Sequence, residues 1–175
     1  LTREAMDAYA IESVNRARAA IENKSLASEI AGMEITGSLV ENDEQPGKAK
    51  IDKIPNLRPA FKADGTITAA NASSISDGAS ALVLTRESSL AGRDPLAQIV
   101  AHATHSIHPS EFTLAPIGAI EKLLAKTGWD LDSVDLFEIN EAFAMVTMLT
   151  SQSLGLDPAK VNVFGGACAQ GHPIG

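Results

Sequence analysis

The sequence predicts an α/β fold, in which helices pack against a parallel or mixed sheet. The first observation is an alternation of strand-like and helix-like segments beyond residue 95, an order typical of strands joined through helices. The second is the composition: the chain has 175 residues, 45% of them apolar and 21% charged, which is typical of a globular protein. The third is that no apolar run approaches the roughly 20 residues that a membrane-spanning helix needs.

The first expected element is an amphipathic helix over residues 2–23. Thr2 is a suitable N-cap, because its hydroxyl can accept a hydrogen bond from a free N–H of the first turn. One face of this helix is formed by residues at helical spacing, namely Met6, Ala10, Ser13, Ala17 and Ile21.

Between this helix and residue 95 the pattern is looser. Residues 41–50 are charged and contain Pro46-Gly47, a turn signal, so we interpret residues 24–59 as a surface loop region and solvated linker. Residues 67–79 are small and polar, which allows close approach of backbone or ligand. A strand is expected at residues 80–85 and a short helix at residues 86–93, and Pro95 marks a boundary after them.

Beyond Pro95 strands and helices alternate. Gly155 and Pro158 mark the end of the last long helix. The expected strands cover residues 96–104, 134–139 and 161–164, and the expected helices cover residues 116–126 and 141–154.

The charge and the single cysteine exclude several classes of protein. A net charge of −8 and a pI near 4.9 argue against a general nucleic-acid surface, which needs clustered Lys and Arg. Cys168 alone permits neither an internal disulfide nor a Cys-rich zinc site. A lone cysteine also fits a reducing compartment. We expect a cytoplasmic protein, with an organellar matrix as the alternative, that binds neither nucleic acid nor membrane.

His172 is the first candidate catalytic residue. It stands between Gly171 and Pro173, so its backbone has a small neighbour on one side and a fixed dihedral on the other. A histidine held rigidly in this way suits a general base or an oxyanion donor. The alternative is a turn histidine that bonds only to the backbone.

Asn140 is the second candidate. It stands where an expected strand passes into an expected helix, and a polar amide at the carboxyl end of a strand commonly faces a ligand crevice. The alternative is an N-cap for the helix that follows, a role that Asn fills well. The residue pattern leaves both roles open.

Three other features are weaker. His102, His105 and His108 are spaced by three, but positions i and i+3 of a strand point to opposite faces, so a shared metal is not expected. The glycine spacing after residue 164 fits neither the dinucleotide fingerprint nor the P-loop. Cys168 lies among small apolar residues, as an ordinary packed thiol does.

Three motifs, in this order and separation, resemble the thiolase family over essentially the whole chain. They read Thr68-Ala-Ala-Asn-Ala-Ser-Ser-Ile-Ser-Asp-Gly-Ala79, Asn140-Glu-Ala-Phe-Ala144 and Val161-Asn-Val-Phe-Gly-Gly-Ala-Cys-Ala-Gln-Gly-His-Pro-Ile-Gly175. Within the family the resemblance is greatest to the acetyl-CoA acetyltransferases, partly through residues 46–50 and 54–61. It implies the thiolase fold, five stacked layers in the order αβαβα, of which this would be a partial chain.

The resemblance also implies a reaction. An acyl group passes from a 3-ketoacyl-CoA to a cysteine thiolate and then to CoA, and in reverse two acetyl-CoA molecules condense. Coenzyme A is a substrate, and no further cofactor and no metal are implied. The family uses a nucleophilic cysteine and an acid/base cysteine, and Cys168 matches neither position, so we expect a fragment that is inactive alone. A medium- or long-chain 3-ketoacyl-CoA thiolase and a non-catalytic CoA-binding fragment are the alternatives.

The family's site residues carry over to eight positions. His172 matches the histidine that activates the nucleophile and donates to the thioester oxygen, and Asn140 matches the asparagine that holds a water there. Phe112 falls where some members carry Met beside the acyl group. The positions that match the CoA pocket and its pantetheine arm are Phe61, Ala69, Ser73, Ala142 and Phe143.

The resemblance further implies domains and an oligomer. Residues 1–68 would be the tail of a loop domain, residues 69–94 the end of the N-terminal domain, and residues 95–175 an incomplete C-terminal domain. A homodimer or homotetramer is expected. The chain departs from the family pattern at Phe164 and at Gln170, which places an amide near the site, and residues 48–53 leave the phosphate contacts unassigned.

Overall fold

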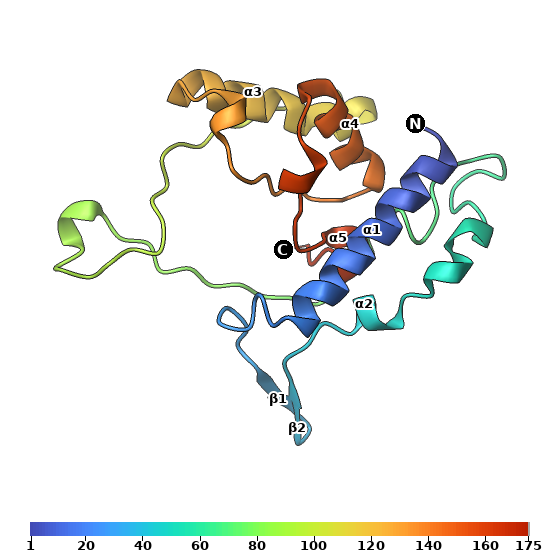
Figure 1. Ribbon diagram of the computed structural model, residues 1–175, viewed down its shortest axis with the longest axis horizontal. Coiled ribbons are helices and arrows are strands. Elements are labelled where there is room, and N and C mark those ends of the chain that lie inside the picture. The colour runs from blue at the N-terminus through green and yellow to red at the C-terminus, as the bar shows by residue number, and fades with distance from the viewer. Residues whose placement is uncertain (175) are drawn as a thin grey trace.

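The computed structural model describes residues 1–174, and its regular structure is mainly helical (Figure 1). Helix α1 (Arg3–Glu22) crosses the body of the molecule and contacts α2 (Gln45–Lys48), α4 (Ala144–Leu154) and α5 (Ala167–Gln170). Helix α3 (Ala115–Thr127) packs on α4. Shorter 3-10 helices cover Ile51–Asn56, Glu87–Ser89, Pro109–Leu114, Leu131–Ser133 and Pro158–Lys160.

Helix α1 confirms the first predicted element. The Thr2 hydroxyl accepts a hydrogen bond from the Ala5 N–H at 3.2 Å and so caps the helix. Four of the five predicted face residues are buried, whereas Ile21, in the last turn, is 37% exposed.

Arginine side chains fasten α1 to segments distant in the sequence. Arg3 donates to the Leu57 carbonyl at 2.8 Å, and Arg18 donates to the Ala49 carbonyl at 2.6 Å. Arg16 donates to the Val161 carbonyl at 2.6 Å. A guanidinium has several donors in a fixed plane, so each arginine satisfies carbonyls that no helix or strand uses.

The interpretation of residues 24–59 as a solvated linker is wrong for part of this region. Strands β1 (Met33–Ile35) and β2 (Ser38–Val40) form an exposed antiparallel hairpin that projects from the body (Figure 1). Its two-residue turn, Thr36-Gly37, has φ angles of 47° and 79°, the left-handed geometry that matches the twist of a hairpin. Beyond the hairpin, Pro46 and Ile54 are buried, because α2 and the 3-10 helix pack on α1.

Helices α3 and α4 confirm two predicted helices. Each ends at a glycine in the left-handed region, Gly128 at φ 70° and Gly155 at φ 67°. This conformation lets the glycine N–H bond back into the last turn, which closes the helix. Helix α4 begins three residues later than predicted, because the backbone through Phe143 is still extended.

The predicted sheet is not formed among residues 1–174. Residues 80–85 and 96–104 have no regular structure, and Val83 and Leu96 are fully exposed. Residues 134–139 and 161–164 are reduced to one parallel bridge, between Phe137 and Val161. A β-strand forms only beside a second strand that shares its backbone hydrogen bonds. The described residues provide no such neighbour for these segments beyond the single bridge, so the predicted strands are wrong for this structure.

Two apolar clusters hold the helices together. One lies between α3, α4 and the last segments, and its buried members are Ile139, Val146, Leu156 and Val161. The other joins α1 to α5 through Val14, Ala17 and Ala169. The segments 137–144 and 161–172 connect these clusters, so their polar residues lie between two packed groups of side chains.

Candidate active site

The three motifs lie side by side, joined by backbone hydrogen bonds. The Ser73 N–H donates to the Ala142 carbonyl at 3.1 Å, which joins the first motif to the second. The His172 N–H donates to the Ser74 carbonyl at 2.7 Å, which joins the third to the first. Segments separated by about 30 to 100 positions in the printed sequence thus form one site. Gly175, the last residue of the third motif, lies outside the described residues.

Asn140 and His172 meet at the centre of this arrangement. The amide nitrogen of Asn140 is 3.3 Å from Nε2 of His172. An amide NH₂ group only donates, so this contact is a hydrogen bond in the tautomer whose Nε2 carries no proton. An imidazole in that tautomer is the form that can take a proton from a thiol.

The structure contradicts the alternative role given above for each of these two residues. The N-cap of α4 is Phe143, not Asn140, so the capping alternative is wrong and the Asn140 side chain is exposed toward His172. The His172 backbone does bond within the turn, but its imidazole also reaches Asn140. The fixed backbone therefore aims the ring.

Aromatic rings from three segments gather beside the second motif. The Phe143 ring lies edge-on to the Phe61 ring, with centroids 6.5 Å apart, and tilted against the Phe112 ring at 6.1 Å. Both separations lie in the range in which aromatic pairs attract. The Phe61 ring remains 75% exposed, so this cluster presents an apolar surface rather than a closed core.

Ser73 and Ala142 are brought together as well. Both the N–H and the hydroxyl of Ser73 bond to the Ala142 carbonyl, each at 3.1 Å. The Ser73 side chain is therefore committed to the backbone. Ala69 lies exposed in the turn between Thr68 and Asn71, where it presents no bulk to a neighbouring molecule.

A wide cavity of about 670 Å³ opens beside Asn140. Phe112 and Ala142 line it, together with Glu138 and Val146. Burial raises the pKa of the Glu138 carboxyl, and the nearby Glu141 carboxylate raises it further. Three of the eight predicted site residues, Phe112, Asn140 and Ala142, therefore share one cavity.

Three buried polar residues were missed by the sequence reasoning: Asn71, Glu141 and Asn162. The Asn162 side chain bonds both to the N–H and to the carbonyl of Ile139, each at 2.8 Å, as a strand neighbour would. Asn71 accepts from the Thr68 N–H at 2.8 Å. Asn71 and Asn162 are each a single polar residue between small or apolar neighbours in the sequence, and that signal could have identified both. Glu141 directly follows Asn140, so the sequence carries no such signal for it.

Cys168 is not arranged as a nucleophile. Burial raises the pKa of its thiol, and the negative charge of Glu141 raises it further. A higher pKa leaves less thiolate, the reactive form, at any given pH. We expect iodoacetamide to modify Cys168 slowly in the folded protein between about pH 7 and 9 and rapidly in urea, as measured by mass spectrometry. Equal rates in both conditions would contradict this.

The other histidines have separate surroundings. The His105 ring lies against Gly118 of α3, and Nδ1 of His108 lies 2.8 Å from the Ser110 hydroxyl. Within residues 1–174, no group of three or more His, Cys, Asp or Glu side chains is placed to hold a metal ion.

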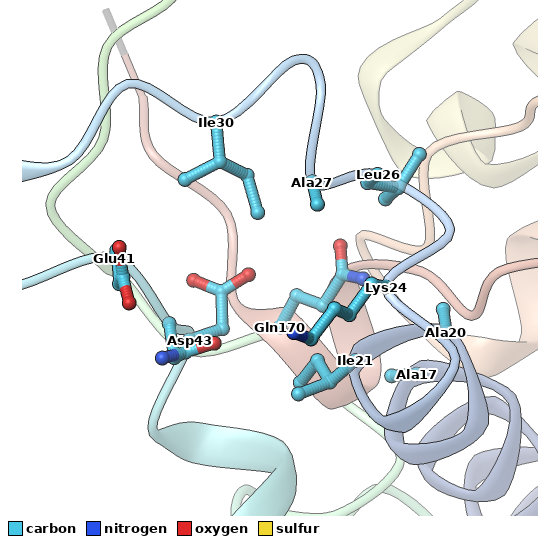
Figure 2. A pocket seen from close by; sticks show the side chains of 11 residues that line it. Ala17, Ala20, Ile21, Lys24, Leu26, Ala27, Ile30, Glu41, Asp43 and Gln170 are labelled. Atoms are coloured by element: carbon cyan, nitrogen blue, oxygen red, sulfur yellow. The ribbon is translucent and has the colours of Figure 1, made fainter.

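Gln170 does not reach the Asn140–His172 pair. Figure 2 shows its amide in a different pocket of about 260 Å³, between the end of α1 and the segment that carries Glu41 and Asp43. Its Nε2 donates to the Phe164 carbonyl at 3.4 Å. The two departures from the family pattern thus contact each other.

No helix among residues 1–174 is both long enough and apolar enough to cross a bilayer.

Comparison with known proteins identifies related sequences along the whole chain. A probable acetyl-CoA acetyltransferase of Dictyostelium discoideum is 46% identical over all of this chain and 44% of that relative. A cytosolic acetyl-CoA acetyltransferase of Gibberella zeae is 44% identical over all of this chain and 46% of that relative. The chain spans about half the length of the curated relatives it matches.

Solved structures agree in conformation. The Acat5 thiolase from Ascaris suum in complex with coenzyme A superposes with a TM-score of 0.96 at 42% identity, over 100% of this chain and 46% of that one. Human mitochondrial 3-ketoacyl-CoA thiolase in complex with CoA superposes with a TM-score of 0.89 at 37% identity, over 99% of this chain and 45% of that one. The described residues therefore have the conformation of part of the thiolase fold.

Family models match both parts of the sequence. Residues 1–88 match the N-terminal domain of thiolase, and residues 93–175 match its C-terminal domain. The finer division at residues 68 and 94 stays a prediction. Motifs, conformation and family models agree, and the chain belongs to the thiolase family.

Proposed function

We propose that this chain carries half of the active site of an acetyl-CoA C-acetyltransferase. The observation that supports the proposal most directly is the 3.3 Å contact between Asn140 and His172. The enzyme would transfer an acyl group between a 3-ketoacyl-CoA and CoA through a cysteine acyl-enzyme, or condense two acetyl-CoA molecules. The two family cysteines would complete the site.

His172 and Asn140 would perform two tasks in the first step. His172 takes the proton of the nucleophilic thiol, and the resulting thiolate attacks the carbonyl carbon of the substrate. Negative charge then develops on the carbonyl oxygen, where the imidazole and a water held by Asn140 would donate hydrogen bonds. Donors positioned in advance at such an oxygen are among the largest contributions to catalysis.

The aromatic surface would receive the CoA substrate. Phe61, Phe112 and Phe143 offer apolar area to a pantetheine arm, and the small side chains of Ala69 and Ala142 leave room for it. The complexes of the two solved relatives with coenzyme A support this use. CoA would be a substrate, with no further cofactor and no metal.

The proposal includes an assembly and a compartment. We propose a homodimer or homotetramer that binds neither nucleic acid nor membrane. A cytoplasmic location follows the cytosolic relative of Gibberella zeae, and a mitochondrial matrix is the alternative that the human relative represents.

Thiolysis of acetoacetyl-CoA by the full-length protein is the test. Loss of the 3-ketoacyl-CoA in the presence of CoA, with acetyl-CoA as the only product, would support the proposal. Faster turnover of medium- or long-chain 3-ketoacyl-CoA would favour the second candidate, a thiolase like the human relative. CoA binding without turnover would instead identify a non-catalytic CoA-binding protein.

Phe112 would set the length of the acyl chain. Its ring lines the cavity beside Asn140, at the position where some relatives carry the more flexible Met. We expect Phe112→Met to raise kcat/KM for six-carbon over four-carbon substrates by about 10-fold, because one or two methylenes in an apolar pocket are worth that much. Phe61→Met is the control and should leave the ratio unchanged, because Phe61 also contacts Phe143 but does not line this cavity.

A further inference from the structure

Glu141 has the most completely satisfied buried charge of the described chain. Its side chain is fully buried, and four donors surround the two carboxylate oxygens. Oε1 accepts from the Tyr9 hydroxyl at 2.8 Å and from the Asn162 amide at 2.9 Å. Oε2 accepts from the Ser13 hydroxyl at 2.8 Å and from the Cys168 N–H at 3.0 Å. This is the full accepting capacity of an ionised carboxylate.

The four donors come from three separate parts of the chain. Tyr9 and Ser13 belong to α1, Asn162 precedes the glycine pair, and Cys168 belongs to α5. Glu141 itself directly follows Asn140, and Cys168 stands four residues before His172. One carboxylate therefore links α1 to both segments that carry the catalytic pair.

Close packing holds the Glu141 carboxylate in one position. A Cβ atom at Gly166 would lie 2.5 Å from Oε1 and 2.7 Å from Oε2, so only glycine fits there. The Gly166 N–H also donates to the Ser13 hydroxyl at 2.9 Å, which extends the network to a fifth donor. Burial raises the pKa of the Tyr9 phenol, and Glu141 raises it further, so Tyr9 remains a donor at neutral pH.

We propose that Glu141 is a positioning residue, which fixes the distance between Asn140 and His172 through this network. The inference rests on the proposed thiolase function. Glu141 does not touch the reacting atoms. It holds the backbone of residue 140 against the turn that delivers residue 172, because a buried carboxylate accepts charge-assisted hydrogen bonds from both sides.

Glu141→Gln tests the inference, since it keeps the shape and removes two acceptor sites. The new NH₂ group must face either the Asn162 amide or the Cys168 N–H, and both are obligate donors in this structure. Asn162 cannot turn its oxygen inward, because that oxygen accepts from the Ile139 N–H at 2.8 Å. One pair of donors is therefore forced apart, on one side or the other.

The experiment measures kcat and KM for acetoacetyl-CoA thiolysis in the full-length protein. Active sites are counted by the stoichiometry of CoA binding in calorimetry. We expect Glu141→Gln to lower kcat per CoA site by about 100-fold, with KM within about 2-fold of the wild type, since a displacement near 1 Å costs that much. Glu12→Gln is the matched control, because Glu12 lies exposed on α1 and bonds only to Arg16.

Tyr9→Phe provides a second test, which still applies if Glu141→Gln does not fold. It removes one donor without creating repulsion, and we expect a loss in kcat of about 5-fold to 10-fold with KM unchanged. A wild-type kcat in Glu141→Gln would overturn the inference. A loss explained entirely by fewer CoA sites would also overturn it, because the role would then be structural. Absence of thiolysis in the wild type would instead refute the proposed function, and the inference with it.

Discussion

His172→Ala is expected to lower kcat for thiolysis by two to three orders of magnitude, because one preorganised donor at a developing oxyanion contributes roughly 3 kcal/mol. The same change removes the base for the thiol proton, which adds to the loss. KM for CoA should change little, since His172 is not among the residues that form the aromatic surface. Steady-state kinetics of the full-length enzyme gives both quantities.

Asn140→Ala is the companion to this variant. We expect a loss of similar size, and we expect the double variant to lose less than the product of the two, because the side chains are 3.3 Å apart and act together. His102→Ala is the control and should retain full activity, because His102 is exposed and does not line the cavity beside Asn140. A His172→Ala enzyme within 10-fold of the wild type would remove His172 from the mechanism.

Asn140 and His172, the proposed catalytic pair, could be singled out in the sequence because their signals are local. His172 stands between glycine and proline, and Asn140 stands where an expected strand passes into an expected helix, so each position is recognisable without its partner. The resemblance to thiolases then named both roles. The contact between the two residues could not be predicted, since it depends on the Ser74 carbonyl and the Ala142 carbonyl holding three distant segments together.

The strands show the opposite case. The apolar patterns at residues 80–85 and 96–104 indicate burial within a sheet, yet Val83 and Leu96 are fully exposed in this structure. An apolar strand pattern indicates that a segment can pair with another strand, but it does not indicate whether that other strand is present. Helices such as α3 close their own hydrogen bonds, so their prediction did not depend on a partner.

The structure gives a physical reason for the glycines of the third motif, which their spacing in the sequence did not indicate. Among residues 1–174, the glycines of this motif each lie against protein atoms. Gly166 faces the Glu141 carboxylate, and Gly171 faces the Ser76 hydroxyl and the Gln45 amide. Gly165 faces the backbone of α1, with the Ser13 carbonyl and the Ala17 N–H as neighbours. The motif is therefore as much a packing requirement as a chemical one.

Gly165→Ala is expected to lower the free energy of unfolding by about 3 kcal/mol. At Gly165 φ is 79°, a region that costs alanine part of this amount. The new Cβ would also lie 2.5 Å from the Ser13 carbonyl oxygen and 2.8 Å from the Ala17 nitrogen, so α1 must shift away. Urea denaturation of the full-length protein measures the change.

Gly155→Ala separates the two causes of this loss. Gly155 has a similar φ of 67°, but nothing lies within 4 Å of the position that a Cβ would take. We therefore expect a loss of only about 1 kcal/mol there, the cost of the backbone conformation alone. If the two variants lost the same free energy of unfolding, the close contact between α1 and Gly165 would not contribute to the loss, which would contradict this prediction. Because α1 also supplies Tyr9 and Ser13 to Glu141, a larger loss at Gly165 should be accompanied by a lower kcat, which Gly155→Ala should not show.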